Sequence, residues 1–213
     1  MGGLPDYITL TPIGDHKEKY LMDFLRSLRS LDPPPVERVV CLDLDTSLPL
    51  EIFTEEKILF SPAIEAQRTS LERICYAREI LRNYFLKTKV DYALWIDSDI
   101  LVPSEIFKVL YEVMEKKKVW IVVNKYLGSP TNYWCGSACM LTHRQACMAS
   151  RFWVGEILTP EGEIKHLSED FIFFSIFDQG GPFLKLWTGR SGRVCDQFVT
   201  VKHLRVEGEG EMK

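Results

Sequence analysis

Two aspartates one residue apart, Asp97 and Asp99, follow directly after an apolar run at residues 93–96. In α/β proteins, buried strands are continuous apolar runs of this kind, and ligands gather beyond their carboxyl ends. Two ionised carboxylates at such a place repel each other unless a cation lies between them. Hard divalent cations take oxygen ligands and often keep further positions for substrate phosphates. The motif therefore predicts a metal site that holds a diphosphate.

The Asp-x-Asp triplet is a weak signal when it is considered by itself. A chain of 213 residues carries about one such triplet by chance at ordinary aspartate abundance. This chain has a second one, Asp43 and Asp45, after the apolar residues 39–42. Two solvated carboxylates at a strand-to-helix turn, stabilised by the helix dipole, account for Asp97 and Asp99 without any chemistry. The functional interpretation therefore depends on other polar residues of the chain.

Adjacent carboxylates recur at Glu169 and Asp170, in the first turn of a predicted helix. The helix dipole favours acidic residues at this position for structural reasons alone. In the functional interpretation, one of the two carboxylates stays ionised and acts as a general base toward the substrate.

Two basic residues, His203 and Arg78, are candidates for binding the metal ion and the phosphate. His203 follows the apolar residues 199–201, and an imidazole is a common third ligand beside two carboxylates, although a lone histidine is more often structural. Arg78 lies on the apolar stripe of a predicted helix, where a guanidinium is costly without a partner. An arginine that reaches from such a stripe into a cleft can bind phosphate or a base edge.

The spacing of apolar residues predicts the elements that position these side chains. Up to residue 123, predicted strands and helices alternate, which indicates right-handed βαβ units and a mostly parallel sheet. The strands are residues 7–10, 39–42, 58–60, 92–96 and 119–123, and the helices are residues 17–29, 67–86 and one that starts near Pro103. Residues 124–140, rich in Gly, Pro, Asn and aromatic residues, break this alternation. Beyond them we predict helices at residues 143–149 and 169–178 and closing strands at residues 183–187 and 194–201.

The composition is that of a folded protein with one α/β domain. Hydrophobic residues make up 46% and charged residues 26% of the sequence, as in ordinary folded proteins. The net charge of −4 does not indicate a nucleic-acid-binding protein. No apolar run reaches the roughly 20 residues that span a bilayer, and the N-terminus lacks a signal pattern. We therefore expect a cytoplasmic protein without a transmembrane segment, and adsorption to a membrane surface stays open. The six dispersed cysteines are expected to be structural, since no second pair completes a zinc site with Cys135 and Cys139.

The order of these features resembles the GT-A class of nucleotide-sugar-dependent glycosyltransferases, and it is most similar to glycosyltransferase family 2. The resemblance covers residues 77–203, whereas the N-terminal strand-helix-strand unit matches more loosely. No single segment is diagnostic, but several in the family's order are fairly specific. The matching segments are residues 77–78 with Asn83 further along the same helix, and residues 94–99, 136–141, 168–171 and 196–203.

The resemblance implies a single α/β domain of GT-A-like (Rossmann-like) type. A mostly parallel central sheet would be flanked by helices and followed by a small antiparallel C-terminal portion. We expect the domain to cover residues 1–206, with a nucleotide-binding half at residues 7–123 and an acceptor or catalytic half at residues 124–206. Residues 207–213, which alternate Glu and Gly, are expected to form a flexible tail.

The resemblance also implies roles at the donor end of the site. Asp99, with Asp97 acting through water or ribose, would hold Mn²⁺ or Mg²⁺ against the donor diphosphate. His203 would complete the metal shell. The residues expected around the donor itself are Thr11, Pro12, Asp43, Arg78 and Ser98, with Gly136 letting the loop backbone approach the sugar and Trp134 stacking on a sugar face.

At the acceptor end, Asp170 would deprotonate the acceptor hydroxyl, and Glu169 beside it would position the acceptor or a loop. In-line attack at the anomeric carbon would then invert the configuration of the sugar. Two departures from the family matter. Arg78 is followed by Glu79 where members often have Asn, and the chain lacks the extended C-terminal region with which many members bind acceptors. The implied partners are a nucleoside-diphosphate sugar and an acceptor that is an unidentified glycan, lipid or protein.

Three alternatives stay open at this point. A phosphatase of the haloacid dehalogenase class would use Asp43 as nucleophile and Asp45 as general acid, but Thr46 and Ser47 then replace the usual Gly-Thr. A GT-A-like domain that binds a nucleotide sugar without turning it over is a non-enzymatic alternative. A sugar nucleotidyltransferase is disfavoured, because no Gly-rich phosphate loop with Arg and Lys follows the first predicted strand.

Overall fold

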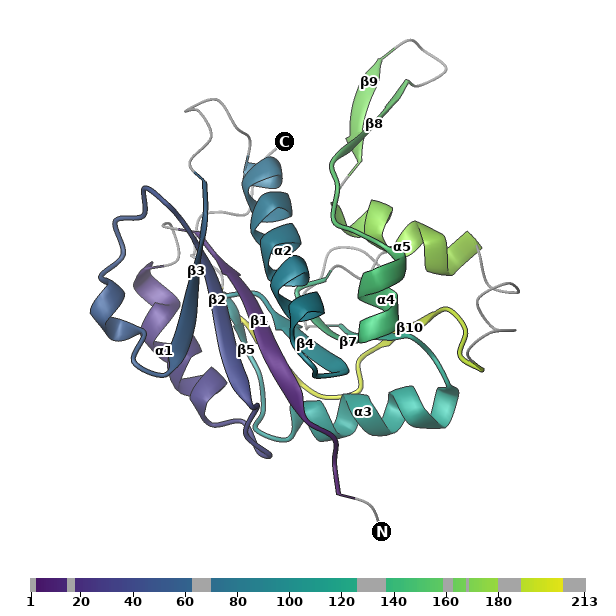
Figure 1. Ribbon diagram of the computed structural model, residues 1–213, viewed down its shortest axis with the longest axis horizontal. Coiled ribbons are helices and arrows are strands. Elements are labelled where there is room, and N and C mark those ends of the chain that lie inside the picture. Colours follow the sequence, from purple (N-terminus) through teal and green to yellow (C-terminus); the bar gives the residue numbers. More distant parts are fainter. Residues whose placement is uncertain are drawn as a thin grey trace.

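A seven-stranded sheet in the order β10-β6-β7-β4-β1-β2-β3 forms the centre of the computed structural model (Figure 1). Strand β7 runs against both of its neighbours, and the other strands are parallel to one another. The structure describes residues 3–14, 18–62, 70–125, 137–158, 163–167, 169–179 and 189–204. The strands are β1 (Tyr7–Ile13), β2 (Glu37–Asp43), β3 (Glu56–Ser61), β4 (Tyr92–Ile96), β6 (Ile121–Asn124), β7 (Cys139–His143) and β10 (Arg193–Asp196).

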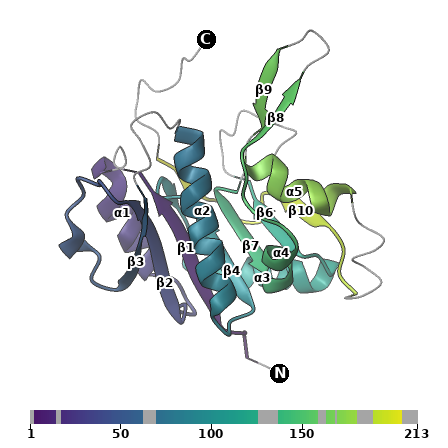
Figure 2. The same ribbon diagram turned by 45° about the horizontal axis from the view of Figure 1, so that its top comes forward.

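Helices cover both faces of this sheet (Figures 1 and 2). Side chains alternate between the faces along each strand, so that Leu94 of β4 packs into one apolar core and the next residue, Trp95, into the other. The first core is shared with α1 (Glu18–Arg29) and α3 (Ile106–Lys117). The second core is shared with α2 (Ser70–Lys87), α4 (Arg144–Ala149) and α5 (Glu169–Gln179). Because both faces are covered, every residue of β4 is buried, as its continuous apolar pattern predicts.

Two smaller sheets extend this framework. Strand β5 (Ile100–Leu101) pairs antiparallel with β11 (Lys202–His203). Strands β8 (Gly155–Leu158) and β9 (Ile164–Leu167) form an antiparallel hairpin that projects away from the helices (Figures 1 and 2). The remaining described element is a short 3-10 helix, η2 (Leu50–Ile52).

The observed elements confirm the predicted alternation up to residue 123 and the mostly parallel sheet flanked by helices. One strand prediction was wrong, and one strand was missed. Residues 194–201 do not form one strand, because the chain leaves the central sheet at Asp196 and only β11 resumes a strand, in another sheet. Strand β7 was not predicted, since its first residues fall in the irregular stretch 124–140 and its last residue begins the helix predicted at residues 143–149. The predicted strand at residues 183–187 and the predicted tail lie outside the described residues.

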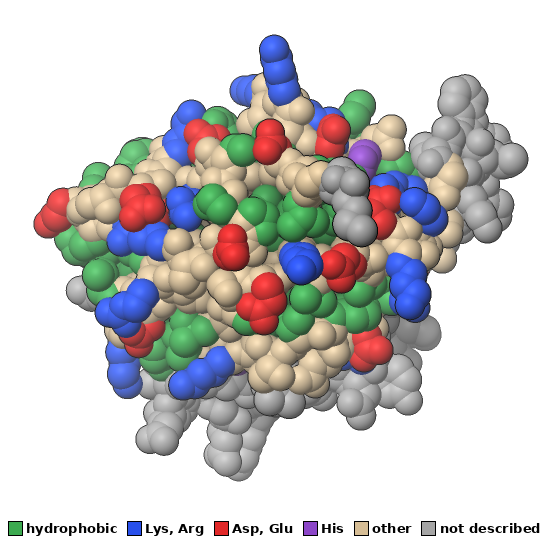
Figure 3. Space-filling view, turned by 90° about the horizontal axis from the view of Figure 1, so that it is seen from below, with side chains coloured by type: hydrophobic (Ala, Val, Ile, Leu, Met, Phe, Trp, Pro, Cys, Tyr) green, Lys and Arg blue, Asp and Glu red, His purple; other side chains and the backbone are tan. Residues whose placement is uncertain are grey.

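The surface carries charges of both signs. On the face at the amino ends of the parallel strands, acidic and basic side chains are interspersed with apolar ones (Figure 3). None of the described helices has a stretch long and apolar enough to cross a bilayer.

The cysteines that the structure describes are mostly buried free thiols. Cys41, Cys139 and Cys147 are in this state, and Cys75 is buried as well, which agrees with their predicted structural role. Burial raises the pKa of the Cys147 thiol to about 12, so it is a poor nucleophile near neutral pH. Cys195 is disulfide-bonded. The cytoplasmic location, where disulfides are rare, stays a prediction.

Candidate active site

The functional candidates gather at one edge of the central sheet. Parallel strands end at the same edge, so Asp43, Asp97 and Asn124, at or just beyond the ends of β2, β4 and β6, belong to it. Strand β7 runs the other way and therefore begins there, which brings Ser137 to the same edge. The backbone N–H of Asp97 donates to the carbonyl of Ala138 at 2.8 Å and closes the gap between β4 and the start of β7.

Arg78 joins two of the predicted acidic residues. Its Nη2 donates to both carboxylate oxygens of Asp97, at 2.8 and 3.0 Å, and its Nη1 donates to Asp170 Oδ1 at 2.8 Å. Only 2% of the Arg78 side chain is exposed, against 20% and 21% for those of Asp97 and Asp170. A buried guanidinium needs such charged partners to offset its desolvation. The costly stripe position of Arg78 is thus offset by a pair of carboxylates, and its contact with a phosphate or a base edge stays a prediction.

Asp170 is held from two sides. Its Oδ2 accepts from the backbone N–H of Ser137 at 3.0 Å, and its Oδ1 accepts from the Ser137 hydroxyl as well as from Arg78. Charge-assisted hydrogen bonds of this kind fix the orientation of a carboxylate. Glu169 begins helix α5 beside it, and the Glu169 side chain is outside the described part of the structure.

Packing behind Asp170 fixes helix α5. The rings of Phe152 and Phe173 stack with centroids 4.3 Å apart, and the Arg78 guanidinium lies 5.8 Å from the centre of the Phe152 ring. Glu79, the residue that departs from the family pattern, accepts from the backbone N–H of Phe152 at 3.2 Å and pairs with Arg82 at 2.7 Å. Glu79 therefore anchors the segment on which α5 rests.

The electrostatics of this edge favour a further cation. Burial raises the pKa of Asp97 above its usual range, and the neighbouring charges of Asp99 and Asp170 act in the same direction, while Arg78 opposes them. Arg78 binds Asp97 and Asp170, and the charge of a third carboxylate, that of Asp99, also acts on Asp97. A divalent cation would relieve this excess of negative charge.

Asp99 and His203 form the second pair of the site. His203 Nε2 lies 3.5 Å from Asp99 Oδ2, and both side chains are largely buried. The backbone brings them together, because His203 pairs with Ile100 across β11 and β5, and the N–H of Leu204 donates to the carbonyl of Asp99 at 2.7 Å.

A metal ion fits this pair only together with a substrate. Among the described residues, no three His, Cys, Asp or Glu side chains are arranged to hold a metal ion by themselves. Mg²⁺ and similar hard cations are commonly bound by one or two carboxylates with substrate phosphates completing the shell. The donor set of Asp99 and His203 suits a cation that arrives with a diphosphate, with Asp97 close by but occupied by Arg78.

The residues predicted around the nucleoside lie at the same edge in different states of burial. Asp43 ends β2, and its Oδ2 lies 3.6 Å from Nη1 of Arg73 in helix α2. Thr11 and Pro12 are buried within β1, which continues to Ile13, beyond the predicted end at residue 10. Ser98 is also buried, whereas Gly136 and Trp134 lie outside the described residues.

Three residues of the site were missed as individual candidates. Asn124 follows an apolar strand just as Asp97 does, so the same signal was present for it. Ser137 stands in a segment that carried the family resemblance, without a role assigned to it. Phe152 has no local signal, because its importance depends on contacts with α2 and α5.

Comparison with known proteins identifies the fold. No protein-family description and no curated protein sequence matches the chain. Among solved structures, residues 1–349 of TarS from S. aureus match 79% of this chain with a TM-score of 0.55 at 15% identity, and the match spans 54% of that structure. The same fragment in complex with UDP-GlcNAc matches 74% of this chain and 51% of its own, at a TM-score of 0.52 and 17% identity.

A second protein matches over more of its length. Glucosyl-3-phosphoglycerate synthase from Mycobacterium tuberculosis, in complex with Mn²⁺, UDP and phosphoglyceric acid, covers 95% of this chain at a TM-score of 0.58 and 12% identity, and the match spans 72% of that structure. At identities this low, the structural match establishes the architecture alone, and both neighbouring proteins share that architecture. The chain has the fold of the GT-A glycosyltransferases.

Proposed function

We propose that this protein transfers a sugar from a nucleoside-diphosphate sugar to an acceptor hydroxyl. The observation that carries the proposal is the contact of one buried guanidinium, that of Arg78, with Asp97 and with Asp170. This contact brings the candidate cation-binding motif and the candidate base into a single site. The GT-A fold supports the same conclusion, because sites in such sheets lie beyond the carboxyl ends of the strands.

The donor would bind at the end of the site formed by β1, β2 and β4. Asp99 and His203 would hold Mn²⁺ or Mg²⁺, with Asp97 beside them, and the cation when bound would neutralise charge on the departing nucleoside diphosphate. Asp43, Thr11, Pro12 and Ser98 would surround the nucleoside, and Gly136 and Trp134 would lie along the sugar. UDP is the first nucleotide to test, since both neighbouring proteins have structures with UDP or UDP-GlcNAc.

Asp170 would act as the general base at the acceptor end. It would take the proton of the acceptor hydroxyl while that oxygen bonds to the anomeric carbon and the bond to the diphosphate breaks. The leaving diphosphate keeps the electron pair. Because the hydroxyl attacks on the side opposite the diphosphate, a single displacement inverts the configuration. Arg78 and Ser137 hold the carboxylate in one orientation for this step. Glu169 would position the acceptor.

The phosphatase alternative receives less support from the geometry. Asp45, its general acid, is exposed, and Asp43 lies against Arg73. In a phosphatase of this class, Asp97 and Asp99 would supply the later acidic ligands. Strand β1 separates β2 from β4, so the two Asp-x-Asp motifs do not follow neighbouring strands.

Thermal shift with UDP, GDP, CDP and dTDP, each with and without Mn²⁺, tests the proposal first. A nucleotide at 100 times its dissociation constant stabilises the fold by about 2.7 kcal/mol, which is easily measured. We expect stabilisation by one nucleotide that depends on Mn²⁺. Release of nucleoside diphosphate from its sugar conjugate then separates an enzyme from a domain that only binds. Stabilisation by none of the four, together with hydrolysis of simple phosphate esters, would overturn the proposal in favour of the phosphatase.

A further inference from the structure

Asn124 is a fully engaged side chain at the end of β6. Its Oδ1 accepts from the backbone N–H groups of Phe198 and Val199 at 2.9 and 3.0 Å, and its Nδ2 donates to the carbonyls of Val199 and Lys125 at 3.0 and 2.9 Å. An asparagine amide offers two donors and has room for two acceptor bonds, so its hydrogen-bonding capacity is used completely. Only 2% of the residue is exposed. Three of the four hydrogen bonds join it to residues 198–199.

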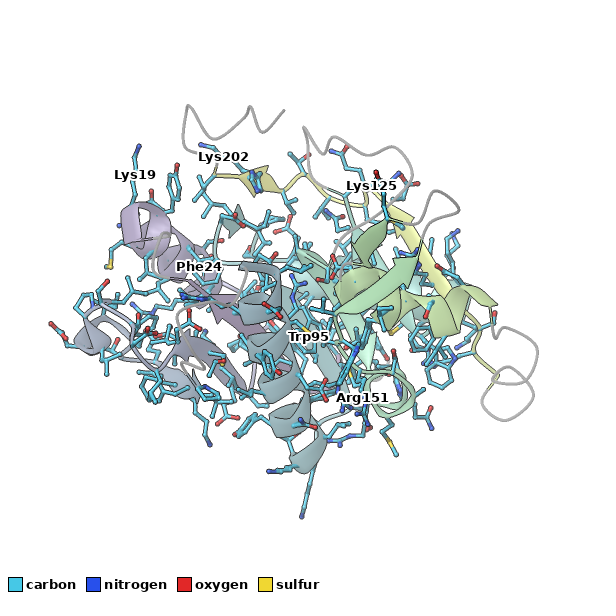
Figure 4. The ribbon with its side chains drawn as sticks, turned by 90° about the horizontal axis from the view of Figure 1, so that it is seen from above. Lys19, Phe24, Trp95, Lys125, Arg151 and Lys202 are labelled. Carbon is cyan, nitrogen blue, oxygen red and sulfur yellow. The ribbon has the colours of Figure 1, made fainter. Side chains whose placement is uncertain are left out.

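The segment that Asn124 holds leads to His203. The chain leaves the central sheet at Asp196, where the N–H of Lys125 donates to the Asp196 carbonyl at 3.0 Å. It returns to strand pairing only at β11, so residues 197–201 have no ladder of their own. Lys125, which is bound to Asp196 just before this segment, and Lys202, which follows the segment, lie along the same rim when the molecule is seen from above (Figure 4). The Phe198 and Val199 side chains are only partly buried, so the hydrogen bonds of Asn124 fix the first part of this segment. The buried side chain of Val201 then holds its last residue before β11 against the first core.

From this path we infer that Asn124 is a positioning residue for the metal-binding pair. Asn124 fixes residues 198–199, and their position fixes the register of β11 against β5. That register places His203 Nε2 3.5 Å from Asp99 Oδ2. Asn124 touches neither substrate nor cation and acts through His203. The inference rests on the proposed function and adds to it a residue outside the motif.

The test measures Mn²⁺ affinity directly, without turnover. Electron paramagnetic resonance of free Mn²⁺ gives the dissociation constant for the protein with UDP present, for the wild type and for His203→Ala, Asn124→Ala and the double variant. Loss of a group that orients a metal ligand commonly costs about 10–100-fold in metal affinity. We expect His203→Ala and Asn124→Ala each to weaken Mn²⁺ binding by about 10-fold or more. The double variant should be no weaker than His203→Ala alone, because Asn124 acts through that ligand.

Two further variants guard against a general loss of structure. Asn124→Ser keeps a hydroxyl that can satisfy one of the four backbone groups and buries no charge, so it should fold where Asn124→Ala does not and weaken Mn²⁺ binding less. Tyr7→Phe removes another hydrogen bond from a buried side chain to a backbone carbonyl, that of Pro33, at the far end of the sheet. It should leave Mn²⁺ affinity unchanged.

The outcomes separate the inference from the proposed function. If His203→Ala weakens Mn²⁺ binding and both Asn124 variants leave it unchanged, the inference fails and the proposed function stands. An additive loss in the double variant overturns the inference as well, because Asn124 then acts by another route. If His203→Ala itself has no effect, the proposed metal site fails and takes the inference with it.

Discussion

Asp97 and Asp170 come from distant parts of the chain and bind the same guanidinium, that of Arg78. The two carboxylates therefore share their main source of positive charge. A change at one is felt by the other through Arg78 and through the repulsion between the two carboxylates. The candidate metal motif and the candidate base thus form one electrostatic unit, in which groups are expected to act non-additively.

Replacement of Arg78 tests this unit most directly. Arg78→Lys keeps the charge but cannot donate to both aspartates in the same fork geometry. We expect the free energy of unfolding to fall by about 2–4 kcal/mol, less than for a fully buried pair because each aspartate is about one-fifth exposed. Sugar transfer should fall by at least 10²-fold, since both ends of the site lose their orientation. Urea denaturation and initial rates measure the two effects.

Arg82→Lys is the matched control for that variant. Arg82 is also buried on α2 and bound to a carboxylate, but it donates to Glu79, Asn83 and the Cys147 carbonyl rather than to Asp97 or Asp170. It should lose stability and keep its transfer rate at a temperature where it is folded. Equal loss of rate in both variants would contradict a specific role for Arg78.

Asp170→Asn separates a catalyst from a binder. The amide keeps the size of the side chain and an acceptor oxygen for Ser137, but it removes the basicity. Asp97 still neutralises Arg78, so the fold should lose only about 1–2 kcal/mol. The transfer rate should fall by about 10²–10⁴-fold, while UDP and Mn²⁺ bind as in the wild type. Calorimetry and initial rates test both statements, and transfer at the wild-type rate would leave Asp170 a structural residue.

The two Asp-x-Asp motifs should respond differently to substitution. Asp99→Asn should abolish the Mn²⁺-dependent part of nucleotide binding and leave the fold intact. Asp43→Asn should weaken nucleotide binding with and without Mn²⁺, because Asp43 lies at the neighbouring end of β2. Thermal shift across a Mn²⁺ series distinguishes these patterns. If Asp43→Asn instead removes activity on simple phosphate esters, the phosphatase reading is correct.

Protonation of His143 should make stability depend on pH. Burial is the main cause that lowers the pKa of His143 in the folded protein, and the charges of Arg190 and Arg144 add to it. The unfolded chain then binds more protons than the folded one between the lowered pKa and about 6.5, so stability falls as the pH drops through that window. His143 caps α4 by accepting from the N–H of Gln145 at 3.2 Å, and asparagine makes the same cap without titrating.

The variant His143→Asn should therefore flatten this dependence. Urea unfolding at pH 7.5, 6.5 and 5.5 gives the slope for the wild type and the variant. The same slope in both proteins would mean that other groups cause the loss of stability in acid.

The parts of the fold that the sequence predicts are those with local signals. Strand β4 has an uninterrupted apolar run because both of its faces are covered, and the carboxylates that end it are visible in the same stretch. The direction of β7 has no such signal, since a short apolar strand looks the same in either orientation. The two residues of β11 form a strand only because they meet β5, so no local pattern predicts them.

The candidate site also contains residues that the sequence predicts and residues that it does not. Asp97, Asp99, Asp170 and His203 are predictable because each is a polar residue next to an element boundary. The partners of Arg78 are not, because they require α2, β4 and α5 to be placed together in space. Asn124 carries the same local signal as Asp97, but an amide at the end of a strand has too many ordinary explanations to be singled out without its contacts.

The reversed direction of β7 has a consequence for how such proteins diversify. Because β7 runs against β6, the end of β6 and the start of β7 lie at the same edge of the sheet, the edge that carries Asp97. Lys125 at one end is bound to Asp196, and Ser137 at the other is bound to Asp170. The described residues on either side of this connection are therefore held by other elements of the protein. Changes of sequence elsewhere can accumulate while the groups at this edge keep their places.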